Sequence, residues 1–362
     1  MITSDDIGSF PLPGNIEKQR INKLIMNLIE PEKESLASSL GFDLIKTPGK
    51  INKKDSGDKN LLYDVVFSIM ELKLNSGIMC PTYPQLQDMI ESFGLCNKHP
   101  VEGEPWVIKD EFARIPEVEL VDRFAYENNK KIDLRVCVTG PLELYLKNFG
   151  NNVEPDLLEN IGLSVSKFIK NIKQNLKNIN LKVVCIDEPT LGLNPNIVFP
   201  KENLINAWDK SINEARDCDF HIHLHSATEI ETVYNSNIHV IGIETAEEQK
   251  NLEVIEKEDF EKYDKFLRLG IARTNIFGLA ADYLEKTGDD VWKTSNFNGM
   301  VNKMENSKII GKRLNKGYKL FGDRISYAGP DCGLGGWKTQ GSAFLLLKNT
   351  ADAVNEFNGK NK

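Results

Sequence analysis

The sequence predicts an α/β protein folded as a (β/α)8 barrel, with residues 1–362 forming one domain. The chain has 362 residues, of which 40% are hydrophobic and 27% charged, so it can bury a large core without disulfide bonds. Short β-branched apolar runs alternate with longer segments of helical spacing, as in βα units around a parallel sheet. Eight such runs occur, and a barrel of eight strands takes about 250 residues. The surplus fits an N-terminal helical region and long loops.

The eight expected strands are residues 6–9, 78–82, 134–139, 183–187, 220–225, 240–244, 266–271 and 325–328. Helices are expected at 157–172 and 204–212, where apolar residues recur every three or four positions. Alternating apolar positions at 106–121 predict a hairpin inserted before the third strand, and the polar segment 51–59 predicts a solvated loop. The alternative is a doubly wound open sheet, but no G-x-G-x-x-G motif follows the first strand.

Charge and composition narrow the class of protein. The chain carries 45 Lys and Arg against 53 Asp and Glu, a net charge of −8, which disfavours binding to nucleic acid. Residues 1–7 lack the pattern of a signal peptide, and no apolar run approaches the roughly 20 residues of a membrane span. We therefore expect a cytoplasmic enzyme for small molecules, with its six cysteines reduced and with no nucleic-acid or membrane partner.

Polar residues gather where the expected strands end. In a (β/α)8 barrel the active site lies at the carboxyl ends of the strands, in the loops that follow them. The residues at these ends that carry suitable chemistry are Ser9, Tyr83, Asp187, Glu188, His223, His225, Glu244 and Cys332. We therefore expect one site at this rim.

The fifth strand holds three of the five histidines of the chain. His221, His223 and His225 alternate with apolar residues, so they share one face of the strand. A single strand histidine is most often a hydrogen-bonded core residue, but this cluster lies beside two further metal-type ligands, Glu244 and Cys332. Two imidazoles, one carboxylate and one thiolate form a plausible tetrahedral zinc set, with Glu244 the ligand most easily exchanged for substrate. His221 lies one pleat deeper and suits the core or a hydrogen bond to a ligand.

Two further motifs surround these ligands. Cys332 lies in a glycine-rich segment, 329–336, ahead of a helix expected near Thr339, and this setting favours a thiolate close to bound ligand. Asp187 and Glu188 suit a general acid/base pair or a clamp for an ammonium group, although strand capping near Pro189 explains them equally well. Because strand neighbours point to opposite faces, only one of the two carboxylates faces the barrel axis. The two facing carboxylates of a glycosidase would come from separate strands, so the pair Asp187-Glu188 is a weak indication of glycosidase chemistry. No G-x-S-x-G motif supports a serine hydrolase.

Six segments of this chain together resemble the cobalamin-independent methionine synthase family, among the zinc-dependent thiol methyltransferases and uroporphyrinogen-decarboxylase-like barrels. These segments are IGSFP at 7–11, TGP at 139–141, IDEP at 186–189, HIHLH at 221–225, IET at 243–245 and GPDCGL at 329–334. Their order and spacing span nearly the whole chain. The resemblance implies a barrel in which zinc binds a substrate thiol, lowers its pKa and presents the thiolate to a methyl donor.

The resemblance also implies roles for single residues. His223, Glu244 and Cys332 fall on zinc-ligand positions, whereas Ser9 and Asp187 fall on positions that hold the amino-acid part of homocysteine. The product is then methionine.

Three departures from the family pattern qualify these expectations. His225 stands where the family has a cysteine ligand, which reduces the ligand charge from −3 to −2 and makes a bound thiolate a weaker nucleophile. Tyr83 stands near the place of a glutamate that helps hold the substrate amino group. The chain also has no room for the second barrel of the longer family members, and residues 142–145 (LELY) stand in place of the aromatic expected for folate stacking directly after the TGP segment.

These departures leave the donor and the acceptor open. A methylcorrinoid, free or on a corrinoid protein, is the expected methyl donor, with a methyltetrahydropteroyl compound as the alternative. Three alternative functions remain. The acceptor is another thiol such as coenzyme M, the enzyme is a thiol-adding lyase, or the barrel binds a corrinoid without catalysis.

Overall fold

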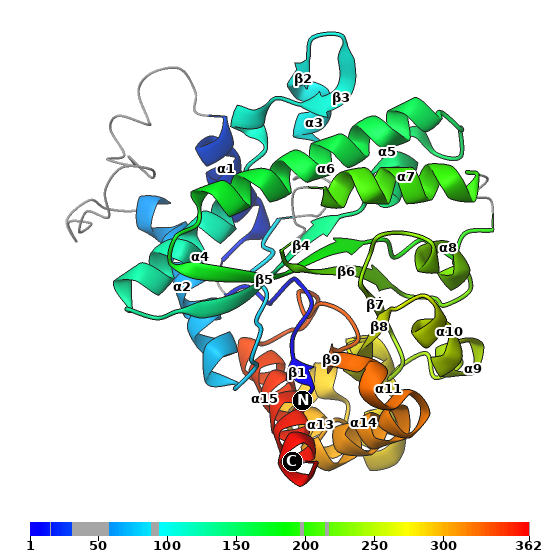
Figure 1. Ribbon diagram of the computed structural model, residues 1–362. Coiled ribbons are helices and arrows are strands. Elements are labelled where there is room, and N and C mark those ends of the chain that lie inside the picture. The colour runs from blue at the N-terminus through cyan, green and yellow to red at the C-terminus, as the bar shows by residue number, and fades with distance from the viewer. Residues whose placement is uncertain (15, 31–57, 88–93, 196–198, 214–216, 362) are drawn as a thin grey trace.

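The computed structural model describes residues 1–14, 16–30, 58–87, 94–195, 199–213 and 217–361 (Figure 1). Its centre is a curled, parallel sheet of seven strands in the order β1-β9-β8-β7-β6-β5-β4. The strands are β1 (Thr3–Ser4), β4 (Ile132–Thr139), β5 (Ile179–Asp187), β6 (Asp219–Leu224), β7 (Val240–Ile243), β8 (Phe266–Ala272) and β9 (Ile325–Pro330). From β4 to β9 the spatial order follows the chain order without a reversal, so the doubly wound alternative is wrong.

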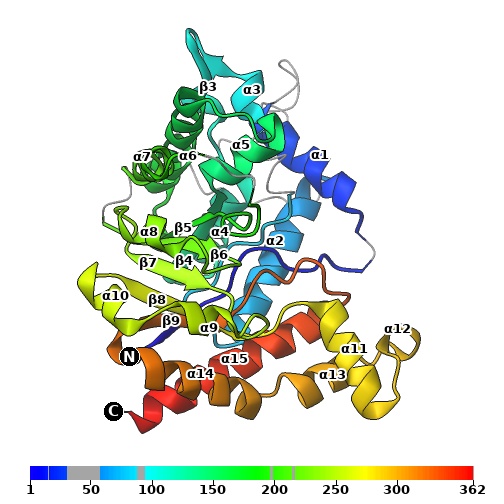
Figure 2. The ribbon, with the colours of Figure 1, turned by 90° about the vertical axis from the view of Figure 1, so that its right-hand side faces the viewer.

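Helices cover the outside of this sheet, with α6 and α7 on one side and α14 and α15 on the opposite side (Figure 2). The longer helices are α1 (Lys18–Ile29), α2 (Asp58–Asn75), α4 (Pro116–Glu127), α5 (Pro141–Phe149), α6 (Pro155–Asn175), α7 (Lys201–Ile212), α11 (Ile276–Thr287), α13 (Phe297–Met304), α14 (Ser307–Phe321) and α15 (Gln340–Lys360). Shorter ones are α3 (Leu95–Lys98), α8 (Ile230–Tyr234), α9 (Asn251–Val254), α10 (Lys257–Lys262) and α12 (Val291–Thr294), with 3-10 turns at Asp110–Phe112 and Gly322–Arg324. In the described part of the chain, none of these helices has the length and hydropathy needed to cross a membrane.

The second expected strand, residues 78–82, is not a regular strand. It makes only isolated parallel bridges, Asp5 with Cys80 on one side and Thr82 with Arg135 on the other. Pro81 has no N–H for a ladder, and the Thr82 N–H donates to Asp6 Oδ1 at 2.7 Å instead of to a neighbouring strand. The prediction of eight regular strands is therefore corrected to a curled sheet of seven.

The first expected strand is displaced. Strand β1 ends at Ser4, before the expected range of 6–9, and Asp5 makes only an isolated bridge. Within the expected range, Gly8 adopts a φ of +58°, which is not a strand conformation. The other expected strands coincide with β4 to β9, with ends shifted by a few residues.

The expected hairpin also lies elsewhere. The antiparallel pair consists of β2 (Pro100–Val101) and β3 (Glu104–Ile108), which project from the molecule at the top of Figure 1. The end of the expected range, residues 116–121, belongs to α4, in which Val118 and Val121 lie one turn apart on the buried face. Their spacing of three residues is typical of a helix, so the prediction of alternating strand positions was wrong here.

The helix predictions agree better with the structure. The ranges 157–172 and 204–212 lie inside α6 and α7, whose apolar faces are buried. Helix α15 begins after Thr339, whose side chain accepts a hydrogen bond from the Ser342 N–H at 3.1 Å and so caps the helix. Of the expected loop 51–59, residues 51–57 lie outside the described residues, and α2 begins at Asp58.

Charged side chains lie on the inner side of the sheet. Asp5 Oδ2 lies 2.8 Å from Arg135 Nη1, and Asp5 Oδ1 lies 2.9 Å from Arg268 Nη2, with all three side chains fully buried. Arg135 Nη1 also donates to His221 Nδ1 at 2.9 Å, so His221 belongs to this core network, as its depth in the strand predicts. These pairs join Asp5, the residue after β1, to β4 and β8, and Arg135 joins β4 to β6.

Candidate metal centre

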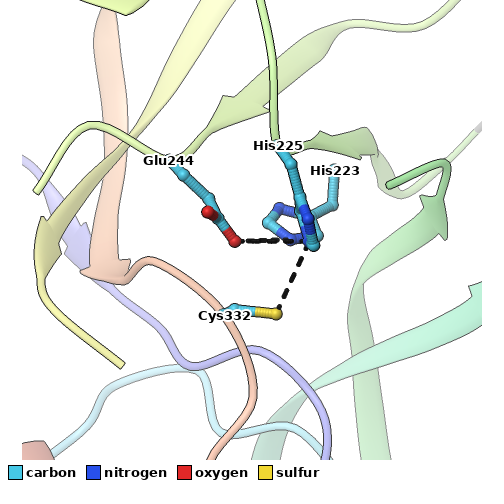
Figure 3. Close-up of side chains that lie close together, drawn as sticks. All are labelled: His223, His225, Glu244 and Cys332. Carbon is cyan, nitrogen blue, oxygen red and sulfur yellow. Dashed lines mark hydrogen bonds and ion pairs between the residues drawn. The ribbon is translucent and has the colours of Figure 1, made fainter. Parts of the chain in front are cut away.

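Four of the expected rim residues lie together in the structure (Figure 3). His223 lies near the end of β6 and His225 just beyond it, Glu244 follows β7, and Cys332 follows β9 by two residues. One ligating atom from each of the four lies within 4.8 Å of all the others. Because parallel strands end on the same edge of the sheet, residues separated by more than 100 positions meet here.

The separations between the ligating atoms suit a single small cation. His225 Nε2 lies 3.2 Å from Glu244 Oε1 and 3.8 Å from Cys332 Sγ, and His223 Nε2 lies 4.0 Å from Glu244 Oε1. Tetrahedral zinc, with bonds of about 2.0–2.3 Å, places its ligand atoms about 3.3–3.8 Å apart. The set of two nitrogens, one oxygen and one sulfur is also typical of zinc.

His223 adds a separate observation. Its side chain is buried, and neither Nδ1 nor Nε2 has a hydrogen-bond partner among the described residues. Buried polar atoms are nearly always paired, because an unpaired one has lost its hydrogen bonds to water. A metal ion bound through one of these nitrogens would supply a partner.

The pKa shifts of the four side chains also suit a bound cation. Burial lowers the pKa of both histidines, for His223 with help from the charge of His225, so both imidazoles are neutral, as metal ligands must be. Burial, followed by the charge of Asp331, raises the pKa of Glu244 to about 8. Burial, followed by the charge of Glu244, raises the pKa of the Cys332 thiol. Burial thus disfavours the charged forms of both Glu244 and Cys332, and a bound divalent cation would stabilise those charged forms.

Ser9 fixes the loop that carries Cys332. Its carbonyl accepts a hydrogen bond from the Leu334 N–H at 2.7 Å, and its hydroxyl accepts one from the Gly335 N–H at 3.1 Å. A Cβ atom at Gly333 or at Gly335 would lie 2.6 Å from Ser9 Oγ, so the close approach depends on both glycines. The expected site residue Ser9 therefore lies against the segment that follows the thiol.

Asp331 is a site residue that the sequence analysis did not assign. Its carboxylate accepts backbone N–H groups from Thr245 and Ala246, both at 3.1 Å, and from Glu247 at 2.7 Å. These three residues directly follow Glu244, and Asp331 directly precedes Cys332 in the chain. The carboxylate thus ties the backbone of one ligand to that of another, and its position next to Cys332 was the available signal.

Asp187 lies beside the cluster on the inner face of the sheet. It is the register partner of His223 on the neighbouring strand and is 3% exposed. Its carboxylate accepts a hydrogen bond from Cys185 Sγ at 3.4 Å, and burial, followed by the charge of Cys137, raises its pKa. Cys137 and Cys185 are register partners one pleat deeper, and Arg135 Nε donates to Cys137 Sγ at 3.3 Å.

Glu188 lies apart from the cluster. Its Oε1 accepts from the Leu142 N–H at 3.0 Å and from Trp208 Nε1 at 2.9 Å, and its Oε2 accepts from the Glu143 N–H at 2.8 Å. The side chain is completely buried and bonded to the first turn of α5. The structure therefore does not bring Glu188 together with the four ligands, and its contacts are those of a helix cap.

Tyr83 is buried, with its hydroxyl against β4. Its hydroxyl donates to the Cys137 carbonyl at 3.0 Å, and Gln85 Nε2 donates to the same carbonyl at 3.2 Å. Burial, followed by the charge of Glu117, raises the pKa of the Tyr83 hydroxyl. The Tyr83 hydroxyl is therefore neutral, and its proton is already donated in the hydrogen bond to the Cys137 carbonyl.

Comparisons with known proteins give a structural likeness. No protein-family model and no curated protein matches the sequence. The structure is similar to a B12-independent methionine synthase from a Shewanella species, solved with selenomethionine, with a TM-score of 0.61, 13% identity, and coverage of 100% of this chain and 98% of the other. It is also similar to a methyltransferase from Methanosarcina mazei, with a TM-score of 0.54, 12% identity, and coverage of 98% and 94%. At these identities the likeness establishes that this chain shares its fold with the two proteins.

Proposed function

We propose that the protein is a zinc-dependent methyltransferase that transfers a methyl group to a small thiol, with homocysteine as the acceptor and methionine as the product. The observation that carries the proposal is the convergence of His223, His225, Glu244 and Cys332 within 4.8 Å. The two solved proteins of the same fold, a methionine synthase and a methyltransferase, support the reaction class. The six sequence segments that resemble the methionine synthase family support the acceptor.

The four ligand residues would hold the metal. When bound, zinc acts as a Lewis acid that lowers the pKa of a thiol and so makes it a nucleophile at neutral pH. His223 and His225 offer neutral nitrogens, and Cys332 offers a sulfur. Glu244 offers a carboxylate oxygen, the hardest donor of the four for the borderline-soft zinc ion, so it is the ligand that we expect an incoming thiol to replace.

Asp187 is proposed to bind the ammonium group of the acceptor. It is a buried carboxylate next to His223, and its hydrogen bond comes from a thiol and not from a cation. A buried carboxylate is stabilised in its charged form by a cationic partner, which the ammonium group of an amino acid would supply. Ser9, against the Cys332 loop, completes the proposed acceptor site, with the ring of Tyr83 as part of its wall.

Catalysis is assigned to the ligand set and Asp187, and not to Glu188. A catalytic carboxylate must touch the reacting groups, whereas both oxygens of Glu188 are bonded to backbone N–H groups and to the indole of Trp208. Orientation of the thiol toward the methyl donor then supplies the rest of the rate acceleration.

The metal part of the proposal is tested by elemental analysis. We expect about one zinc per purified chain, lost in Cys332→Ala and retained in Cys218→Ala. Cys218 is a matched control because it is also a free cysteine, but it precedes β6 and so lies at the opposite end of that strand from the ligands. Zinc-free protein with full transfer activity would overturn the proposal.

The reaction is tested by single-turnover mixing with methylcobalamin, which we propose as a model of the natural methylcorrinoid donor. Homocysteine should change the cobalt–carbon absorbance, and coenzyme M should do so at least about 10²-fold more slowly, because a site built for an ammonium group excludes a molecule that lacks it. Faster reaction with coenzyme M would reassign the acceptor. The same mixing is repeated with methyltetrahydrofolate in place of methylcobalamin, and methyl transfer from methyltetrahydrofolate but not from methylcobalamin would reassign the donor. No transfer from either donor, with the cobalt–carbon absorbance unchanged, would indicate a binding protein.

A further inference from the structure

A single amide side chain joins the backbones of two of the metal-ligand residues. Asn251, the first residue of α9, is 8% exposed. Its Nδ2 donates to the carbonyl oxygen of His225 at 2.9 Å and to the carbonyl oxygen of Glu244 at 2.8 Å. Its Oδ1 accepts from the Ala227 N–H at 3.0 Å, which fixes the plane of the amide and tells its oxygen from its nitrogen.

The amide acts where the strand ladder stops. Strands β6 and β7 are paired up to Leu224 and Ile243, and a last ladder bond runs from the Glu244 N–H to the Leu224 carbonyl at 3.3 Å. His225 is the residue directly after β6. Its carbonyl and the carbonyl of Glu244 both accept hydrogen bonds from the Asn251 amide. Two carbonyls are both acceptors and cannot bond each other, so joining them needs a group with two donors.

Among short side chains only asparagine meets this need. Its NH2 group carries two N–H donors in one plane, whereas a serine or threonine hydroxyl carries one donor and an ionised aspartate carries none. Glutamine has the same donors, but one more methylene would push them past their partners. The residue type at position 251 is thus matched to the two carbonyls.

We propose that Asn251 is a positioning residue that sets the separation of His225 and Glu244 before the metal binds. The inference rests on the proposed zinc site, because the two joined backbones carry two of its four ligands. Ligands that are already held near their bound positions lose less conformational freedom when the ion arrives, so affinity rises. Asn251 touches neither the ion nor the acceptor in this scheme.

The test is the equilibrium affinity for Zn²⁺, measured by competition with a chelator, together with the visible spectrum of the Co²⁺-substituted protein. Asn251→Asp, which keeps the shape and removes both donors, should weaken affinity by about 10- to 100-fold and alter the Co²⁺ bands. Asn251→Ser, with one donor, should fall between Asn251→Asp and the unmodified chain. If Asn251→Asp does not fold, Asn251→Ser alone decides the proposal by the same two measurements.

Asn358 supplies a matched control. Its amide also bridges backbone groups, because Oδ1 accepts from the Ile2 N–H at 3.0 Å and Nδ2 donates to the Ile2 carbonyl at 2.8 Å, but these lie near the chain ends and away from the ligands. Asn358→Ala should lower the melting temperature and leave Zn²⁺ affinity and the Co²⁺ spectrum unchanged. Equal effects of the two asparagines, or unchanged affinity in the Asn251 variants, would overturn the positioning role. Absence of Zn²⁺ binding by the unmodified chain would instead overturn the proposed function on which that role rests.

Discussion

The loop that carries Cys332 is held against Ser9 so closely that one methyl group should displace it. In Gly335→Ala the new Cβ would lie 2.6 Å from Ser9 Oγ and 2.7 Å from Ser9 Cβ, where ordinary contacts begin at 3.4 Å. The loop or Ser9 must therefore move by about 0.7 Å, the difference between 3.4 and 2.7 Å. Overpacking of this kind costs about 1–3 kcal/mol.

That cost corresponds to a fall in melting temperature of about 1–4 °C, because the unfolding entropy of a chain of 362 residues is about 0.76 kcal/mol/K. A movement of about 0.7 Å also exceeds the tolerance of about 0.2 Å in metal–ligand distances, so zinc affinity should fall as well. Scanning calorimetry and chelator competition measure the two effects.

Gly336 and Ser9 provide the controls. A Cβ at Gly336 meets nothing within 4 Å, so Gly336→Ala should leave both stability and zinc affinity unchanged. Ser9→Gly removes both clashing atoms together with the hydrogen bond to the Gly335 N–H, worth about 1 kcal/mol. The double variant should then be about as stable as Ser9→Gly alone, a coupling of about 1–3 kcal/mol in a double-mutant cycle. Equal behaviour of Gly335→Ala and Gly336→Ala would refute the steric reasoning.

Two predictions concern the buried charges. Asp5→Asn leaves the guanidinium groups of Arg135 and Arg268 without their carboxylate, so it should lower the free energy of unfolding in urea by about 3–5 kcal/mol. Asp264→Asn, which breaks an exposed ion pair with Arg324, should lower it by less than about 1 kcal/mol. Equal losses in the two variants would contradict the burial argument. Burial, followed by the charge of Arg135, holds the pKa of His221 well below its usual value, so below about pH 6.5 only the unfolded chain takes up this proton. The protein should therefore lose up to about 1.4 kcal/mol per pH unit relative to His221→Gln as the pH falls, and a difference independent of pH would contradict this.

Much of the fold was predictable because the strands are local apolar runs. Strands β4 to β9 and helices α6, α7 and α15 were expected near their observed positions, since burial on both faces of a parallel sheet selects continuous apolar residues. Residues 78–82 have the same composition, yet they form only isolated bridges. The Asp6 side chain takes the Thr82 N–H, and this contact spans 76 positions in the chain.

The candidate metal-ligand cluster was also predictable, for a geometric reason. Alternation along β6 puts His223 and His225 on one face, and the carboxyl ends of parallel strands meet, so Glu244 and Cys332 had to lie near them. The sequence did not show which of the neighbours Asp187 and Glu188 lies beside the histidines. Only their contacts distinguish the carboxylate beside His223 from the one bonded to α5 and Trp208.

The sequence by itself thus determined that His223, His225, Glu244 and Cys332 meet at one rim of the sheet, because this follows from strand periodicity and chain direction. The tertiary structure decided how those side chains are held. Asp331 and Asn251 bond to the backbone beside ligand residues that are distant or offset in the chain, and Gly335 allows Ser9 to approach the thiol loop. Backbone N–H and carbonyl groups are present at every position in a sequence, so which of them a polar side chain meets is fixed only when the elements pack.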